Sequence, residues 1–295
     1  MRLRPLVAVF AGWALALALT GCASEPVPDQ PEPSPPLFAI EGADGTIKGW
    51  LMGTIHALPD GVRWRTDAIE QVIEAADRVI VEVADPTSDE TRAVFAQLAA
   101  TPNLPPLAQR VAPSLRGDLL QLMKKAGVTP GDFRATETWA AALSLAQAAT
   151  PGSRSNSVDV AIIAQFPKDR VTQLEGAATQ LAIFDALEDA DQRALLEGIV
   201  REAETVTQRA HELDRAWLTG DLDAIETATG TGFLTDPQLR AALLTDRNTA
   251  WAAQLAPDLA GETRPLIAVG AAHLPGPEGL ISLLEGNGFI LRQLR

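Results

Sequence analysis

Several residue types are scarce in this chain: among 295 residues there are one cysteine, three histidines and no tyrosine. With one cysteine an internal disulfide is impossible, so stability must come from the hydrophobic core. Aromatic residues make up only 5% and the formal net charge is −14. Nucleic-acid binding needs aromatic stacking platforms, or an excess of lysine and arginine to neutralise phosphates. Nucleic acid is therefore not expected as a partner.

Several catalytic motifs are missing as well. The sequence contains no Gly-x-Ser-x-Gly nucleophile turn, no phosphate-binding P-loop and no glycine-rich dinucleotide fingerprint. What the chain does have is 46% apolar residues, and its length is sufficient for one large domain with a substantial core.

The N-terminus has the features of a bacterial export signal. Two arginines precede an apolar run at residues 5–19, which is too short to span a membrane as a helix. The following Leu19-Thr20-Gly21-Cys22 resembles the lipobox, which is cut before a cysteine that then carries lipid. We expect residues 1–21 to be a lipoprotein signal peptide and Cys22 to be lipidated, which anchors the protein at the periplasmic face of the envelope, at the outer membrane. An ordinary signal peptide followed by an unpaired cysteine is the alternative.

Residues 22–36 contain six prolines among small and acidic residues, a composition typical of an extended tether. The folded domain is then expected at residues 37–295. Short apolar runs typical of strands lie near both of its ends and surround a largely helical middle. This order predicts an α/β fold with a central mixed β-sheet, flanked by helices, and a large helical insertion between the N-terminal and C-terminal strands.

Two of the three histidines end the same short pattern. Gly53-Thr54-Ile55-His56 follows one apolar run, and Gly270-Ala271-Ala272-His273 follows another more than two hundred residues later. Open α/β sheets bind ligands at the ends of their strands, and glycine there permits close approach. Either histidine alone could be structural, but the shared pattern predicts that the two act together. His211 lies in a polar helical stretch and is expected to be a surface or semi-buried helix residue.

Three carboxylates are further candidates. Glu82 lies in the β-branched run 78–83, where an ionised carboxylate is costly unless it is paired or bound to a metal. A solvated strand face is the alternative for Glu82. Glu175 ends a similar run with weaker apolar flanks. Asp159 follows a polar loop and is either a site residue or the cap of a short helix.

Two neutral imidazoles and one carboxylate suit a divalent metal ion, and zinc, manganese, cobalt and iron all fit such a set. The predicted ligands are His56, His273 and Glu82. A metal ion lowers the pKa of bound water and polarises a substrate carbonyl, and a second carboxylate such as Glu175 can act as general base. The sequence leaves open which carboxylate is the ligand and which is the base.

The motifs together resemble those of the TraB/PrgY/GumN family, which is similar to the Tiki metalloproteases. The resemblance spans residues 37–295 and rests on the order of six segments: residues 50–56, 79–82, 158–159, 174–175, 244–251 and 269–273. It implies an α/β domain with a divalent-metal site and peptidase activity on a peptide or protein substrate. His56 and His273 match the two motif histidines, and Glu82 matches the family's strand glutamate.

The resemblance also implies roles for residues near this centre. Arg247 and Asn248 match the family's helical Arg-Asn pair, which implies that they hold a substrate carboxylate or position the site. A helix cap or an ion pair is the alternative for Arg247. Asp159 is a candidate for substrate binding, although Ser157 stands where the family usually has glycine, two residues before this aspartate.

The sequence therefore predicts a lipid-anchored, metal-dependent hydrolase, first of all a metallopeptidase. Two other functions stay open. One is a lipoprotein that binds and sequesters a peptide without cleaving it. The other is a metal-free hydrolase in which one histidine is the general base, as in the similar erythromycin-esterase-like enzymes.

Overall fold

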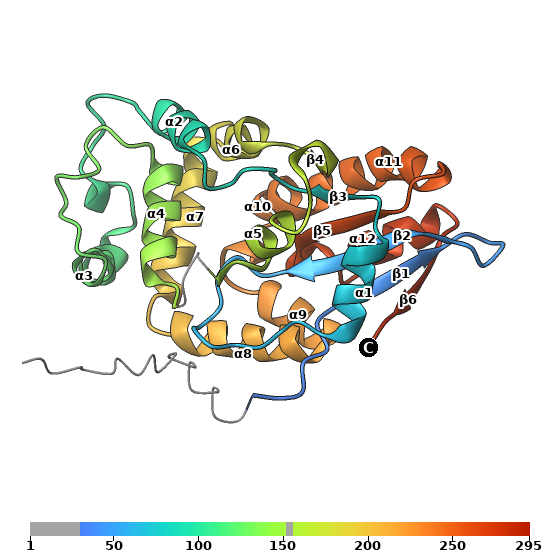
Figure 1. Cartoon of the computed structure of the whole chain (residues 1–295). Coiled ribbons are helices and arrows are strands. Elements are labelled where there is room, and N and C mark those ends of the chain that lie inside the picture. The colour runs from blue at the N-terminus through green and yellow to red at the C-terminus, as the bar shows by residue number, and fades with distance from the viewer. Residues whose placement is uncertain (1–29, 152–155) are drawn as a thin grey trace, which may run out of the picture.

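The computed structural model describes residues 30–151 and 156–295, so the predicted signal peptide and Cys22 lie outside the described residues. A six-stranded sheet forms the centre, and its strands are arranged in the order β4-β3-β5-β2-β1-β6 (Figure 1). The strands are β1 (Leu37–Glu41), β2 (Ile47–Thr54), β3 (Arg78–Val81), β4 (Val171–Gln173), β5 (Pro265–Gly270) and β6 (Ile290–Gln293). Four of them, β2, β5, β3 and β4, are parallel, whereas β1 runs antiparallel to both of its neighbours. The predicted mixed sheet is confirmed.

The hairpin of β1 and β2 forms where the sequence places turn residues. Gly45 has a φ of 77°, and the Asp44 carboxylate accepts hydrogen bonds from the Thr46 backbone N–H at 3.0 Å and its hydroxyl at 2.7 Å. Glycine permits the positive φ and the aspartate holds the turn closed. The hairpin fixes the register that carries β2 to its end at Thr54.

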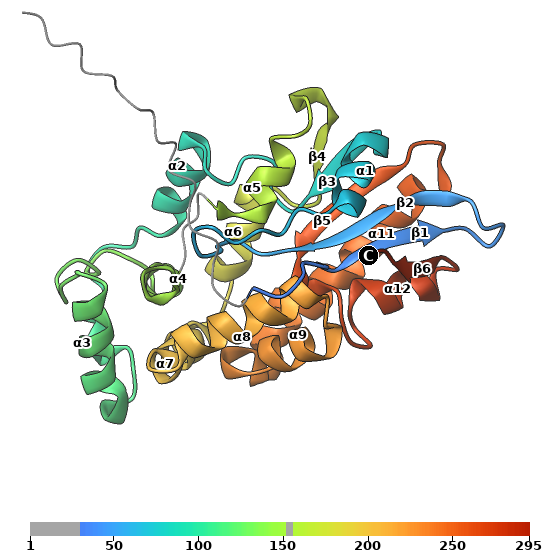
Figure 2. The ribbon, with the colours of Figure 1, turned by 60° about the horizontal axis from the view of Figure 1, so that its bottom comes forward.

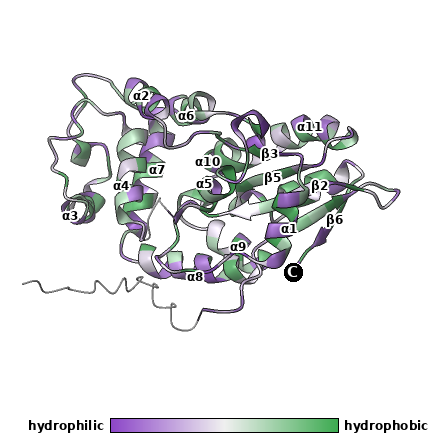
Figure 3. Cartoon of the chain, viewed as in Figure 1, coloured by the Kyte–Doolittle hydropathy of each residue, from purple (hydrophilic) through white to green (hydrophobic). Residues whose placement is uncertain are grey.

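Helices cover both faces of the sheet, which explains why the parallel strands are apolar throughout. In β5, Leu266 and Ala268 pack on one face, and Ile267 and Val269 pack on the other. The first face is covered by α1 (Asp67–Ala75), α5 (Val158–Ile163), α8 (Val206–Thr219) and α9 (Leu222–Thr229). The second face is covered by α11 (Asp246–Ala260) and α12 (Leu280–Gly286). Figure 3 shows the apolar strands between these layers.

A helical lobe stands beside the sheet and has its own core around Trp139, Leu196 and Leu122 (Figures 1 and 2). It contains α2 (Asp89–Leu98), α3 (Arg116–Lys125), α4 (Thr138–Ala149), α6 (Ala177–Asp185), α7 (Asp189–Glu202) and α10 (Pro237–Arg240). The lobe is the predicted helical insertion. It is assembled from three stretches of chain, because α5 and β4 return to the sheet between α4 and α6, and α8 and α9 pack on the sheet between α7 and α10.

Two local predictions differ from the structure by small shifts. β3 ends at Val81, so Glu82 is the first residue beyond the strand. The cap of α2 is Ser88, whose hydroxyl accepts from the Thr91 backbone N–H. The cap of α5 is likewise Ser157, which leaves Asp159 available for another contact.

The described end of the proline-rich segment lies along the domain. Ser34 donates its backbone N–H to Leu218 at 2.7 Å, and the Pro36 carbonyl accepts from Gly53 at 2.9 Å. Gln30 pairs through its side-chain amide with the backbone of Arg63. Among the described helices none is both long and apolar enough to cross a membrane.

Candidate active site

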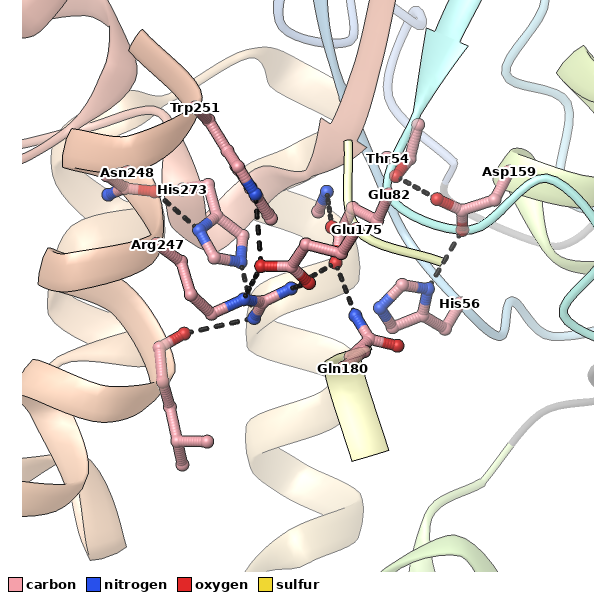
Figure 4. Close-up of polar contacts among 12 residues, drawn as sticks. Thr54, His56, Glu82, Asp159, Glu175, Gln180, Arg247, Asn248, Trp251 and His273 are labelled. Carbon is pink, nitrogen blue, oxygen red and sulfur yellow. Dashed lines mark hydrogen bonds and ion pairs between the residues drawn. The ribbon is translucent and has the colours of Figure 1, made fainter. Parts of the chain in front are cut away.

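The candidate residues meet where the four parallel strands end. Thr54 of β2 is paired with Gly270 of β5, and Val81 of β3 is paired with both Ala268 of β5 and Gln173 of β4. The segments that follow these strands therefore leave the sheet at one edge, at the position where open α/β folds bind ligands. The predicted convergence of the two histidine motifs and Glu82 is seen in the structure (Figure 4).

One part of the site, which we call the exposed half, consists of Thr54, His56, Ser157 and Asp159. The His56 side chain is 73% exposed, and its Nδ1 lies 2.9 Å from Oδ2 of Asp159. The Thr54 hydroxyl donates to Oδ1 of Asp159 at 2.5 Å, and the Ser157 hydroxyl donates to Oδ2 at 3.1 Å. A carboxylate at this position accepts the proton of Nδ1, so that Nε2 carries the ring's lone pair.

The Asp159 carboxylate is itself kept ionised. Burial raises its pKa, but the His56 ring and the hydrogen bonds from His56 and Thr54 outweigh burial and hold the pKa below its usual value. Asp159 therefore orients an exposed imidazole, as carboxylates do beside ligand or general-base histidines.

The other part, which we call the buried half, consists of Glu82, Glu175, Arg247, Asn248, Trp251 and His273. His273 lies in a short 3₁₀ turn after β5, and only 5% of it is exposed. Its Nδ1 is 2.6 Å from Oδ1 of Asn248, whose side-chain nitrogen donates to the Glu278 carbonyl. Because the Asn248 nitrogen faces a carbonyl, its oxygen faces the ring, and His273 must carry its proton on Nδ1. Its Nε2 then offers the lone pair.

Burial lowers the pKa of His273 to about 4, and the guanidinium of Arg247 disfavours a second positive charge beside it, although Glu82 acts in the opposite direction. The ring is therefore neutral at pH 7, which is the form that a metal ligand or a general base requires. Trp251 packs against it with ring centroids 4.5 Å apart.

Glu82 lies at the centre of the site. Its Oε1 accepts the Gly270 backbone N–H at 2.8 Å, and its Oε2 accepts from Arg247 at 2.7 Å and from Gln180 at 2.9 Å. Burial raises the pKa of Glu82, but the His273 ring, Arg247, the His56 ring and the Gly270 N–H together hold it below its ordinary value. Since His273 is neutral above about pH 4, Arg247 is the permanent charge that keeps Glu82 ionised at pH 7.

Arg247 is held by more than Glu82. Its Nε and Nη2 donate to the two oxygens of Glu175 at 2.9 and 3.0 Å, and its Nη1 donates to the Leu243 carbonyl at 3.1 Å. The guanidinium also stacks on Trp251, 4.6 Å from the ring centroid. Burial lowers the pKa of Arg247, but the hydrogen bonds and charges of Glu175 and Glu82 raise it overall. Leu243 belongs to a π-helical turn (Ala241–Thr245) that opens α11, a distortion frequent at functional sites.

Gly270 provides the space in which the two halves face each other. A Cβ atom on this residue would lie 3.3 Å from Oε1 of Glu82, 3.6 Å from Cδ2 of His273 and 3.8 Å from Nε2 of His56. These three side chains come from the ends of three strands and surround one small volume. That volume exists because residue 270 has no side chain.

The donor types in this volume fit a divalent cation. Glu82, Glu175 and Asp159 against the single guanidinium of Arg247 leave a formal charge of −2, which a divalent ion would neutralise. Both imidazoles have their Nδ1 engaged, the arrangement that fixes the orientation of ligand histidines. Within residues 30–151 and 156–295, however, no three His, Cys, Asp or Glu side chains already lie at ligand spacing. Arg247 bridges Glu82 and His273 instead.

The structure assigns positions to the other predicted site residues. Both oxygens of Glu175 are engaged by Arg247, and Oε1 also accepts the Trp251 indole N–H at 3.0 Å. Asn248 holds His273, and Asp159 holds His56. A direct contact of Asn248 or Asp159 with substrate, and a role of Glu175 as general base, stay predictions. His211 is exposed on α8, away from this set, as expected.

Four residues of the site were not predicted as such: Thr54, Ser157, Gln180 and Trp251. Thr54 could have been predicted, since it lies inside the first histidine motif. No sequence pattern indicates Gln180, because its contact with Glu82 depends on how α6 of the helical lobe packs.

The fold and these residues define a class of protein: an α/β domain with a histidine–carboxylate centre at the carboxyl edge of its parallel strands. The model of the TraB/PrgY/gumN family matches residues 36–293, which is most of the chain, and the protein belongs to this family. Neither the curated proteins nor the solved structures contain a match to the chain.

Proposed function

We propose that the protein is a metal-dependent hydrolase whose substrates are peptides or proteins. The observation that carries this proposal is the convergence of His56, Glu82 and His273 on the space above Gly270. His56 and His273 would hold the ion through Nε2, because Asp159 and Asn248 engage Nδ1. Glu82 would be the third ligand, or the base beside it.

A divalent ion in such a site supplies Lewis acidity, which acidifies water and polarises a carbonyl group. The protein's own residues supply the rest. Asp159 and Asn248 orient the two rings, and Arg247 keeps Glu82 ionised and able to accept a proton. Glu175 holds Arg247 in place. The choice of peptide bonds follows from the resemblance of the motif set to the Tiki metalloproteases.

A metal-free hydrolase is the second candidate, and a specific observation favours it. Arg247 already neutralises part of the charge on Glu82, and His56 is an exposed imidazole backed by a carboxylate whose side chain is only 13% exposed. Such a pair can act as a general base towards water without a metal ion, with Arg247 stabilising negative charge that develops on the substrate.

The deciding experiment combines elemental analysis with an activity assay. Purified protein and its His56→Ala/His273→Ala variant are analysed for bound metal, then incubated with peptide mixtures and Mn²⁺, Co²⁺ or Zn²⁺, and the products are read by mass spectrometry. We expect metal and cleavage in the wild type and neither in the variant. Equal metal content in both proteins would refute a metal site at these residues.

The same assay separates the rivals. Cleavage that survives a chelator supports the metal-free hydrolase. Tight peptide binding with intact peptide after long incubation supports a sequestering protein without catalysis.

We further propose that lipid on Cys22 anchors the domain to the bacterial envelope, at the periplasmic face of the outer membrane. Radiolabelled fatty acid incorporated into the wild type but not into Cys22→Ser is the expected result.

A further inference from the structure

Arg247 makes contact with two of the three proposed metal ligands. Its Nη2 lies 2.7 Å from Oε2 of Glu82, and its Nη1 lies 3.3 Å from Nε2 of His273. Since Asn248 engages Nδ1 of His273, Nε2 is the ring nitrogen that an ion would have to use. The guanidinium thus faces the same lone pair that the proposed metal site needs.

The position of Arg247 does not depend on those two ligands. Glu175 binds it through both carboxylate oxygens, the Leu243 carbonyl accepts from Nη1, and Trp251 covers one face of the guanidinium. An arginine with a two-point carboxylate partner and an aromatic face beneath it is strongly oriented. An ion entering between Glu82 and His273 would therefore meet a fixed positive charge.

We infer that Arg247 is a built-in competitor of the metal ion: it holds Glu82 and His273 in the ion-free protein and must release Nε2 of His273 when an ion binds. This inference rests on the proposed metal-dependent function and deepens it. It makes Arg247 the residue that sets metal affinity, in addition to its role in keeping Glu82 ionised. It also explains why the described side chains show donors of the right type without three at ligand spacing.

The test removes the competitor without changing the charge of the site. In the double variant Glu175→Gln/Arg247→Gln one negative and one positive charge disappear together, and Glu82 keeps its hydrogen bonds from Gln180 and Gly270. A matched control is Asp77→Asn/Arg264→Gln. That pair is also a carboxylate–arginine contact beside a tryptophan, but it precedes β3 and β5, at the opposite end of the sheet.

Metal-stripped wild type, double variant and control are titrated with Zn²⁺ and with Mn²⁺ by isothermal calorimetry. We expect the double variant to bind at least about tenfold more tightly than the wild type, the order of one charge-assisted hydrogen bond. The control is expected to match the wild type. Arg247→Lys serves as a second variant that leaves Glu175 intact: lysine keeps the charge but cannot bridge three partners, so tighter binding than wild type is again expected.

The outcomes separate this inference from the proposed function. If the wild type binds metal and both Arg247 variants bind it equally or more weakly, Arg247 does not compete with the ion, but the proposed metal site is supported. If none of the proteins binds metal, both the competition by Arg247 and the proposed metal site are refuted. Binding by the double variant alone supports the competition and shows that Arg247 blocks the site in the wild type.

Discussion

The two histidine motifs lie at the ends of neighbouring strands, yet they build different halves of the site. In the exposed half, His56 is open to solvent and backed by the Asp159 carboxylate. In the buried half, His273 is enclosed, backed by the neutral Asn248 amide and packed on Trp251. Local sequence similarity thus accompanies the same position at the sheet edge, but neither the same backbone turn nor the same electrostatic environment: a 3₁₀ turn carries His273, whereas His56 lies in a bend after β2.

The difference indicates a division of work. A carboxylate behind an imidazole fixes the orientation of the ring and strengthens it as a ligand or base, which suits a ring that is open to solvent. An amide behind a buried ring leaves it neutral over a wide pH range. We therefore expect changes in the buried half to reduce stability, and changes in the exposed half to reduce function while the fold persists.

The largest effect is expected for Arg247→Ala in the buried half. The side chains of Glu82 and Glu175 are 10% and 8% exposed, and both would lose their ion-pair partner. Breaking a buried pair from one side costs about 3–5 kcal/mol. Chemical denaturation should show this decrease in the free energy of unfolding. As a control, Arg264→Ala removes a half-exposed pair with Asp77 and should cost at most about 1 kcal/mol.

The next effect is a pH dependence of stability that comes from His273. Its pKa in the folded protein is about 4, against an ordinary histidine value of 6.5. As the pH falls from about 6.5 to 4, the unfolded chain takes up a proton that the folded state does not, so about 3 kcal/mol of stability is lost and is regained as the pH rises. Denaturation in the presence of a chelator should show this loss in the wild type and not in His273→Gln. A pH profile of His273→Gln parallel to that of the wild type would contradict the neutral buried ring.

Exchanging the partners of the two rings tests the division directly. Asp159→Asn keeps the shape of the side chain but removes its charge, and loss of such a partner typically lowers metal affinity or activity by about 10–100-fold. Stability should change by no more than about 1 kcal/mol, since the Thr54 and Ser157 hydroxyls can reorient. The reciprocal Asn248→Asp should raise the pKa of His273, which NMR titration of the ring protons would record. Unchanged metal binding and activity in Asp159→Asn would remove His56 from the proposed centre.

Much of this arrangement was predictable because it depends on short-range patterns. The turn at residues 42–45 sets the register of β2, and the β-branched runs ending at Val81 and Val269 specify buried strands. Strands of this kind lie parallel in a covered sheet, so their ends had to meet at one edge. Glu82 could be predicted as a site residue because an ionised carboxylate in a buried run is costly unless it is paired or bound to a metal.

The contacts that define each ring were beyond the reach of the sequence. The local sequence does not show whether Asp159 is the partner of His56 or the cap of α5. In the structure the Ser157 hydroxyl caps the helix, and the Asp159 carboxylate is therefore available to His56. The same holds for Gln180, which reaches Glu82 only through the packing of the helical lobe. Arg247 faces Glu175 and Glu82 because a π-helical turn sets the start of α11, and such a turn has no clear sequence signature.

The two motif glycines give the smallest and most discriminating comparison. A Cβ on Gly53 would lie 3.0 Å from Leu274 and 3.2 Å from Cα and Cβ of Ala271, so Gly53 allows the two motifs to pack together. A Cβ on Gly270 meets nothing closer than 3.3 Å, and its φ of −50° suits alanine. Gly53→Ala should therefore lower the free energy of unfolding by roughly 1–3 kcal/mol through overpacking, whereas Gly270→Ala should cost less than about 1 kcal/mol. Yet the new methyl group of Gly270→Ala would occupy the volume between His56, Glu82 and His273. A folded Gly270→Ala protein that still binds metal and cleaves peptide as the wild type does would show that this volume is not the reaction site.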